Sequence, residues 1–175
     1  MKIIILFLLT FTTLLNNIDR SDSSTVPVSS RNCIPADVSA ARRAVSDLFE
    51  NDRNDYPDFY AGCYMTVNKK RLVVMFTADD TSEYDYLLEE HPCIIFRKAE
   101  YNLDELWEMY YDFEERNYYA MFPEIEFSAY VSKKYNCLEI TVYPYSYTEE
   151  NINKLEAALQ DYPIRITEQG HMVAL

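Results

Sequence analysis

Apolar residues recur with a helical period in three long segments of the chain. The first segment, 36–50, carries them at intervals of three or four, which predicts an amphipathic helix. The strongest helix is predicted to begin after Asn102 and to extend to about 119, because Glu105 stands three residues further on as the partner of a capping box. A third helix is predicted from the cap residue Thr148 to about 161, and a shorter one at 79–90. The buried stripes of the first two helices are predicted to be Val38, Ala41, Val45, Leu48 and Phe49, and Leu103, Leu106, Trp107, Tyr110 and Phe113.

Between these helices the apolar positions alternate, which predicts β-strands. Leu138, Ile140 and Val142, for example, alternate with neighbours of other kinds, the pattern of a half-buried strand. The predicted order is one helix, then β-β-α-β over 59–99, then the long helix, then β-β-α-β again over 125–168. The sequence therefore predicts an α+β fold: two β-β-α-β units with antiparallel sheets packed on helices, joined by a long central helix, plus an N-terminal helix. The strands are predicted at 59–67, 72–77, 93–99, 125–131, 138–143 and 164–168.

The N-terminal segment has the pattern of a signal peptide. Lys2 precedes an apolar run over 3–15, which is shorter than the roughly 20 residues that a membrane-spanning helix needs. We therefore expect a secreted, extracellular protein with no membrane association after cleavage. The predicted organisation is a signal peptide at 1–20, a flexible leader at 21–34, a first α+β subdomain at 35–100, a connecting helix at 101–124, a second α+β subdomain at 125–169 and a tail at 170–175.

The charge of the chain limits the partners it can bind. Without residues 1–20 the chain has fourteen Lys and Arg against twenty-eight Asp and Glu, a net charge of −14. Such a field repels nucleic acid and anionic lipid, so phosphate-backbone binding is excluded as a main activity. It favours a cationic partner, although the same charge also serves simply to keep a secreted domain soluble.

The four cysteines, Cys33, Cys63, Cys93 and Cys137, are an even number in a chain predicted to be exported. We therefore expect two disulfides, for which three connectivities are possible. Because Cys63 and Cys93 fall in or beside strands of one unit, the pairing Cys63–Cys93 with Cys33–Cys137 is preferred.

Motifs for catalysis or for metal binding are weak in this sequence. The two glycines, Gly62 and Gly170, are too few for a serine-protease nucleophile loop or for a phosphate-binding loop. The paired carboxylates fall mostly at predicted helix ends, where solvated charge is the simpler interpretation. An acidic run at 79–83 lacks the spacing and the glycine of an EF-hand. We expect no enzymatic activity, no cofactor and no metal site; a small hydrolase using carboxylates is the minor alternative.

Tyrosine is unusually frequent, with sixteen in the chain. Tyrosine is enriched in protein-binding surfaces because it offers contact area with a polar tip. The outward face of the second hairpin, with Ser128, Tyr130, Thr141, Tyr143 and Tyr145, is the best candidate for a partner-binding surface. The alternative is that these tyrosines only fill the core and its boundary.

Several short motifs together suggest a family. Residues 56–64 read Tyr-Pro-Asp-Phe-Tyr-Ala-Gly-Cys-Tyr and are followed by an apolar strand at 72–74; a Tyr-Asn-Leu-x-x-Leu helix start follows at 101–106, and Asn136 precedes a later strand. Over 56–168 the chain resembles the pro-region of bacterial secreted chymotrypsin-like serine proteases, the alpha-lytic protease and streptogrisin group, in a stand-alone form without the protease domain.

This resemblance implies a non-catalytic binding domain that acts as a folding chaperone or inhibitor of a secreted serine protease. In that family the sheet of the C-terminal half packs against the protease, and the tail approaches the active site. The alternative is a secreted structural or interaction domain with no protease partner. The residues expected to bind a protease are Tyr130, Tyr143 and Tyr145 with the tail residues Gly170, His171, Met172, Val173, Ala174 and Leu175.

Overall fold

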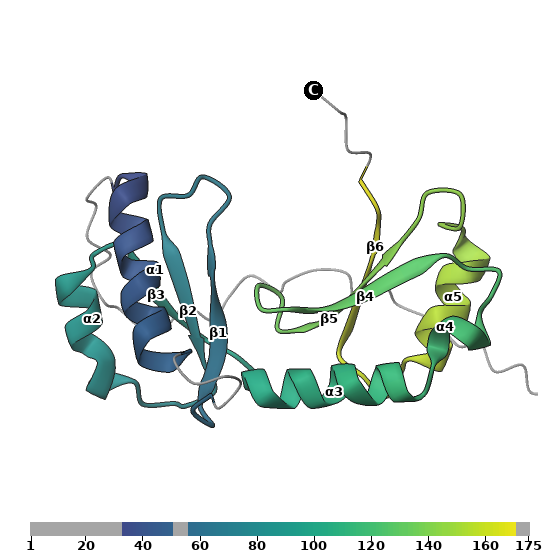
Figure 1. Cartoon of the computed structure of the whole chain (residues 1–175), viewed down its shortest axis with the longest axis horizontal. Coiled ribbons are helices and arrows are strands. Elements are labelled where there is room, and N and C mark those ends of the chain that lie inside the picture. The colour runs from purple at the N-terminus through teal and green to yellow at the C-terminus, as the bar shows by residue number, and fades with distance from the viewer. Residues whose placement is uncertain (1–32, 51–55, 171–175) are drawn as a thin grey trace, which may run out of the picture. The chain divides into compact units, whose positions relative to one another are not determined.

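The computed structural model describes residues 33–50 and 56–170 (Figure 1). Two segments of this chain each fold into a hairpin, a helix and a third strand. The resulting three-stranded sheets have the strand orders β1-β2-β3 and β4-β5-β6. The strands are β1 (Tyr60–Met65), β2 (Leu72–Phe76), β3 (Ile94–Lys98), β4 (Phe127–Ser132), β5 (Cys137–Val142) and β6 (Ile164–Glu168). The helices are α1 (Pro35–Phe49), η1 (Ser82–Tyr84), α2 (Asp85–Glu90), α3 (Leu103–Glu115), α4 (Tyr118–Met121) and α5 (Glu149–Ala158).

The predicted α+β class and the two β-β-α-β units are confirmed, but the sheets are mixed rather than antiparallel. The first two strands of each sheet are antiparallel. The third strand runs parallel to the second in both sheets. The physical reason is that each helix lies on one face of its sheet and returns the chain to the end at which the previous strand began.

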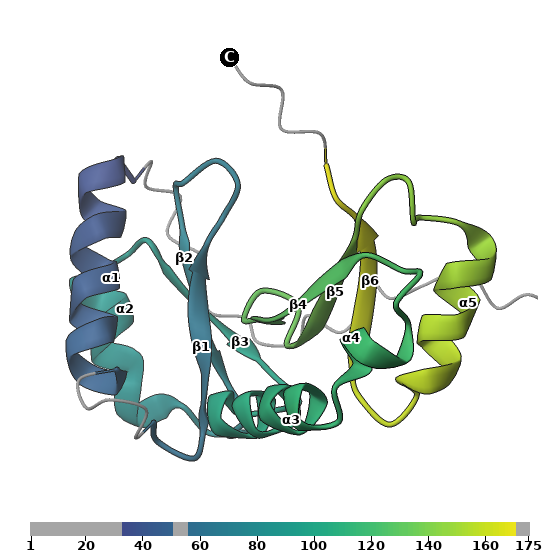
Figure 2. The ribbon, with the colours of Figure 1, turned by 45° about the vertical axis from the view of Figure 1, so that its right-hand side comes forward.

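Each sheet buries one face against helices. On the first sheet, α1 and α2 cover the face that carries Leu72, Val74 and Phe76 (Figures 1 and 2). On the second sheet, Leu138, Ile140 and Val142 pack with residues of α3, α4 and α5. Both of these core clusters nevertheless lie within a single compact part of the chain.

Helix α3 contributes to both cores and begins as its sequence predicts. Asn102 Oδ1 accepts a hydrogen bond from the Glu105 amide at 2.8 Å, and Glu105 Oε2 accepts one from the Asn102 amide at 2.7 Å. Leu103 at its start belongs to the first core cluster, and Phe113 near its end belongs to the second. One helix thus ties the hydrophobic cores of both units together.

Three details of the helices differ from expectation. The predicted single helix to 119 is interrupted after α3, because Asn117 adopts a left-handed conformation (φ 53°) that ends one helix before α4 begins. Leu48 was expected in the buried stripe of α1, but 42% of it is exposed. Trp107 and Tyr110 are only partly buried, so the buried stripe of α3 is narrower than its apolar residues suggested.

The turn between β4 and β5 contacts the first unit. The Asn136 side chain accepts hydrogen bonds from the amides of Glu100 and Tyr101, both at 2.8 Å, and donates one to the Tyr101 carbonyl at 2.7 Å. Asn136 itself has a left-handed backbone (φ 52°), which asparagine tolerates better than most residues. A single side chain therefore fixes both the shape of this turn and its attachment to the segment before α3.

Lys133 in the same turn completes the attachment. A Cβ on Gly62 would come within 2.8 Å of the Lys133 side-chain carbons. Gly62 also has a φ of +100°, so this position requires glycine. The Lys133 ammonium reaches Glu50 Oε1 at 3.2 Å. Glu50 also accepts hydrogen bonds from Arg42 Nη2 and from the Tyr60 hydroxyl, both at 2.8 Å. We call Arg42, Glu50, Tyr60 and Lys133 the Glu50 cluster.

The Glu50 cluster keeps its carboxylate ionised although it is largely buried. Burial by itself raises the pKa of Glu50, but the hydrogen bonds from Arg42 and Tyr60 and the charge of Lys133 outweigh it, so the pKa lies below the ordinary value. Burial, together with the nearby Cys63 and Glu50, raises the pKa of Tyr60 far above that of a free tyrosine, so its hydroxyl remains a donor. The cluster is therefore a partly buried ion-pair network between α1, β1 and the β4–β5 turn.

Replacing Asn136 tests the turn attachment. We expect Asn136→Ala to lower the free energy of unfolding by about 2–3 kcal/mol, because three hydrogen bonds are lost and alanine is strained at positive φ. Asn68→Ala is the matched control in the exposed β1–β2 turn, where the side chain makes only local bonds, and it should cost about 1 kcal/mol or less. Urea unfolding measures both; equal losses in the two variants would contradict the attachment.

Removing the charge of Glu50 tests the ion-pair network. A lowered folded-state pKa means that the carboxylate stabilises the fold above its unfolded pKa of about 4.3, and that this contribution is lost as the pH falls through the folded value. We therefore expect Glu50→Gln to be about 1–3 kcal/mol less stable than wild type at pH 7. The difference should shrink as the pH falls below that unfolded value and through the lowered folded value. Exposed Glu115→Gln is the control, and a pH-independent effect of Glu50→Gln would refute the interpretation.

Candidate protein-binding face of the second sheet

The two sheets can be compared residue by residue through their strand registers. The parallel ladder of the first sheet begins with Leu72 opposite Ile94, and that of the second begins with Leu138 opposite Ile164. The next pair on the face away from the helices is Val73 opposite Ile95 in the first sheet. In the second sheet the corresponding pair is Glu139 opposite Arg165. An apolar pair in one unit thus corresponds to an ion pair in the other.

The next pair on this face is Met75 opposite Arg97 in the first sheet and Thr141 opposite Thr167 in the second. Met75 in the first sheet is buried and apolar, and its counterpart in the second sheet is Thr141. Tyr64 opposite Val73 corresponds to Tyr130 opposite Glu139, so a tyrosine stands at the same position in both sheets. We define the outward face as the side of the second sheet formed by Ser128, Tyr130, Glu139, Thr141, Arg165 and Thr167.

Glu139 is the centre of the outward face. Only 8% of it is exposed, and its two oxygens are both used. Oε1 accepts from Arg165 Nη1 at 2.7 Å, and Oε2 accepts from the Ser132 hydroxyl at 2.9 Å. A buried carboxylate needs such partners, because leaving it without them costs several kcal/mol. The arrangement fixes the Arg165 guanidinium in one place on the surface.

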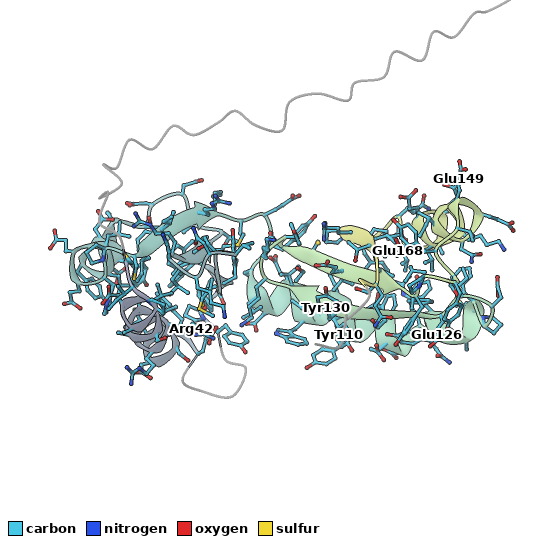
Figure 3. All side chains as sticks on the ribbon, turned by 90° about the horizontal axis from the view of Figure 1, so that it is seen from above. Arg42, Tyr110, Glu126, Tyr130, Glu149 and Glu168 are labelled. Atoms are coloured by element: carbon cyan, nitrogen blue, oxygen red, sulfur yellow. The ribbon has the colours of Figure 1, made fainter. Side chains whose placement is uncertain are left out.

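Two tyrosines stand beside this ion pair. The Arg165 guanidinium lies 3.9 Å from the ring centre of Tyr135, which is a cation–π contact. Tyr130 on β4, labelled in Figure 3, is 45% exposed. Its partial burial raises the pKa of Tyr130, and a hydrogen bond with Thr141 partly opposes that effect, so the phenol stays protonated at neutral pH. The outward face therefore offers ordered aromatic rings and charged groups to a partner.

The other two predicted tyrosines lie in and beside the loop between β5 and α5. Tyr145 is 70% exposed, and its ring centre lies 6.1 Å from that of Tyr143. Buried Ser146 holds this loop, since its hydroxyl accepts from the Glu126 amide at 3.1 Å and its carbonyl accepts from Asn151 Nδ2 at 2.8 Å. Tyr143 is four residues beyond Glu139 along the chain, about 13 Å at the rise of a strand. The structure therefore places Tyr143 and Tyr145 together, but apart from Tyr130.

The predicted tail ligand is described only at its first residue. Gly170 lies just beyond β6. The pairing of β6 with β5 continues one residue past the strand, because the Gln169 amide donates to the Val142 carbonyl at 2.8 Å. His171, Met172, Val173, Ala174 and Leu175 lie outside the described residues.

The expected disulfide pairs are not found. All four cysteines lie in the described part of the chain, and no disulfide joins any two of them. The pair Cys63–Cys93 is also wrong on topology. Cys93 lies beside Leu72 at one edge of β2, and Cys63 lies across β2 on β1, so two strand spacings of about 4.8 Å separate them, whereas bridged cysteines need Cα atoms within about 7 Å.

The chemistry open to the outward face is recognition through hydrogen bonds, charge and aromatic contact. Cys137, at the start of β5, is buried, and burial together with Glu139 raises the pKa of this thiol to about 11. Among the described residues no group of three or more His, Cys, Asp and Glu is arranged to hold a metal ion. None of the described helices combines the length and the apolarity that crossing a bilayer requires.

The chain matches no protein-family model, and it matches no curated protein.

The sequence predicted Tyr130, Tyr143 and Tyr145 as partner-binding residues, and the structure places only Tyr130 of these three on the same face as Glu139 and Arg165, which the sequence did not single out. Glu139 alternates with the apolar positions Leu138 and Ile140 of its strand, which predicts an outward side chain but no ion pair. Arg165 could not be linked to it without the parallel pairing of β5 and β6, which places the two residues opposite one another. The signal in the sequence was that Glu139 and Arg165, of opposite charge, are each the second residue of a predicted strand and lie between two apolar residues.

Removing Arg165 tests the organisation of the outward face. We expect Arg165→Ala to lower the free energy of unfolding by about 1–2 kcal/mol, because Glu139 keeps its buried charge and loses its cationic partner; the value is below that of a fully buried pair since Arg165 is partly exposed. Arg97→Ala on β3, whose side chain makes one long bond with Tyr64, is the control and should change stability by about 0.5 kcal/mol or less. Thermal or urea unfolding decides; similar values for both variants would show that the ion pair does not organise this face.

Proposed function

We propose that this protein is an exported, non-catalytic binding domain that docks a protein partner on the outward face of its second sheet. The observation that carries this proposal is the register comparison of the two sheets. Where the first sheet has Val73 and Ile95, the second has the ion pair Glu139–Arg165. Stability alone does not require that exchange, because replacing an ion pair by packed apolar groups is often neutral or stabilising.

The composition of the face supports a protein as the partner. Tyr130 on this face and Tyr135, which contacts Arg165, are each more than 40% exposed. Arginine and tyrosine are the residue types most enriched at the centre of protein interfaces. The Arg165 guanidinium is already held by Glu139 and by the Tyr135 ring before binding, which lowers the entropy that a partner must overcome.

The charge of the chain indicates a cationic partner. The whole sequence carries a net charge of −13. An acidic protein attracts a basic one at long range and associates with it faster at low ionic strength. The partner we propose is a secreted serine protease with a basic surface, because residues 56–168 resemble a protease pro-region and in that family the C-terminal sheet is the docking surface. The domain would then act as a folding chaperone or an inhibitor.

The export of the protein belongs to the same proposal. Lys2 and the apolar run over 3–15 support a signal peptide. A protease partner would be met outside the cell, and the acidic chain would be soluble there.

Binding measurements with purified proteases test the proposal. We expect micromolar or tighter binding to at least one basic chymotrypsin-like protease in a panel, and weaker binding when salt is raised from 0.05 to 0.5 M. Tyr130→Ala should weaken that binding by about tenfold or more. Tyr86→Ala is the matched control, since Tyr86 is 43% exposed but lies on α2 in the first unit.

Two results would overturn parts of the proposal separately. Equal effects of Tyr130→Ala and Tyr86→Ala would refute the outward face as the docking surface. The absence of binding to every protease in the panel would refute a protease as the partner and would favour the alternative, a secreted structural or interaction domain with another partner. Capture of a non-protease protein from the culture medium that depends on Tyr130 would identify that alternative directly.

A further inference from the structure

Two cysteines that are distant in the sequence meet at the N-terminal end of α1. Cys33 lies two residues before the helix, and Cys93 lies immediately before β3. Both belong to the first core cluster, where they are 8% and 1% exposed. Their side chains share a hydrogen bond, and Cys93 Sγ also lies 3.6 Å from the Asp37 carbonyl in the first turn of α1.

The two cysteines line one cavity. Cys33 and Cys93 line the same cavity of about 330 Å³, together with Ala40 of α1 and with His91 and Pro92 at the end of α2. Cys63 and Cys137 do not line this cavity. This pair therefore combines mutual contact with a shared cavity.

We propose that Cys33 and Cys93 form a disulfide that fastens the start of α1 to the edge of the first sheet. The pairing differs from both pairs that sequence position favoured. It follows from the contact between the two side chains and from the cavity that they share.

A low-molecular-weight disulfide such as oxidised glutathione supplies the oxidant, and the exchange balances. The Cys33 thiolate attacks one glutathione sulfur, which breaks the glutathione disulfide and releases one glutathione thiolate. Cys93 then loses its proton and attacks the Cys33 sulfur, which releases the second glutathione. Both thiolates take up the protons that the cysteines gave up, so two protein thiols are oxidised and one glutathione disulfide is reduced.

The bridge would join the start of α1 covalently to the residue before β3. It would close a loop that contains α1, the β1–β2 hairpin and α2, and closing a long loop restricts the unfolded chain most. It would also fix the residue at which the N-terminal segment joins the folded unit. The expected role is therefore structural.

Peptide mapping of the oxidised protein tests the pairing. The full chain is purified under reducing conditions, treated with oxidised glutathione, alkylated and digested without reduction. We expect mass spectrometry to find one linked peptide pair that contains Cys33 and Cys93. The melting temperature of the oxidised protein should exceed that of the reduced protein by roughly 10 °C.

Variants separate this pair from the other cysteines. Cys33→Ala and Cys93→Ala should abolish the linked peptide and the difference in melting temperature between oxidised and reduced protein. Cys63→Ala, the matched control in the same unit, should keep both. The proposal is overturned if Cys33 and Cys93 are found alkylated, if each carries a separate glutathione, or if either is linked to Cys63 or Cys137.

Discussion

The contact between the β4–β5 turn and the first unit is the interaction on which the rest of this structure depends. Each β-β-α-β unit alone is a three-stranded sheet covered on one face by short helices, and units of that size bury a small core. Three hydrogen bonds of Asn136 and the approach of Lys133 to Gly62 and Glu50 join the second hairpin to the first unit. Helix α3 adds an apolar connection, with Leu103 in one core and Phe113 in the other. Together these contacts let two small cores stabilise one another.

The two sheets differ in the residues that they carry on the face away from the helices. The first sheet buries Val73 and Met75 on the face away from α1 and α2. The second sheet carries Glu139, Thr141 and Arg165 at related positions, with exposed tyrosines around them. The same topology is thus used once to build a core on both faces and once to build a polar surface. The proposed function rests on this difference, because the second sheet holds an ion pair where the first sheet holds Val73 opposite Ile95.

Local chemistry explains which parts of the fold the sequence could predict. The capping box of Asn102 and Glu105 and the cap at Thr148 involve residues three apart, and both are found as expected. Alternation located the six strands to within a few residues for the same reason. The parallel third strands were missed because their pairing depends on where a helix packs, which no local pattern encodes. The interruption at Asn117 was missed because an asparagine inside an apolar helical pattern is compatible with either backbone conformation.

The same distinction applies to the candidate site. Tyr130 could be placed on the outward face from strand alternation alone, since that rule needs only the parity of its position. Arg165 and Tyr135 belong to the site through contacts made across strands and around a turn, so their roles became visible only in three dimensions. The cysteines are a further example: position in sequence favoured Cys63–Cys93, whereas the sheet order puts β2 between them, and Cys93 shares a cavity with Cys33 instead.

Native-state hydrogen exchange of the whole chain tests most directly whether the joint makes one cooperative fold. The amides of β2 and of β5 are the probes, because each lies at the centre of its sheet. We predict that the slowest amides of both strands exchange through one common opening, with free energies that agree within about 1 kcal/mol and fall together as denaturant is added. Amides of one sheet that exchange through an opening several kcal/mol lower than those of the other would contradict the account.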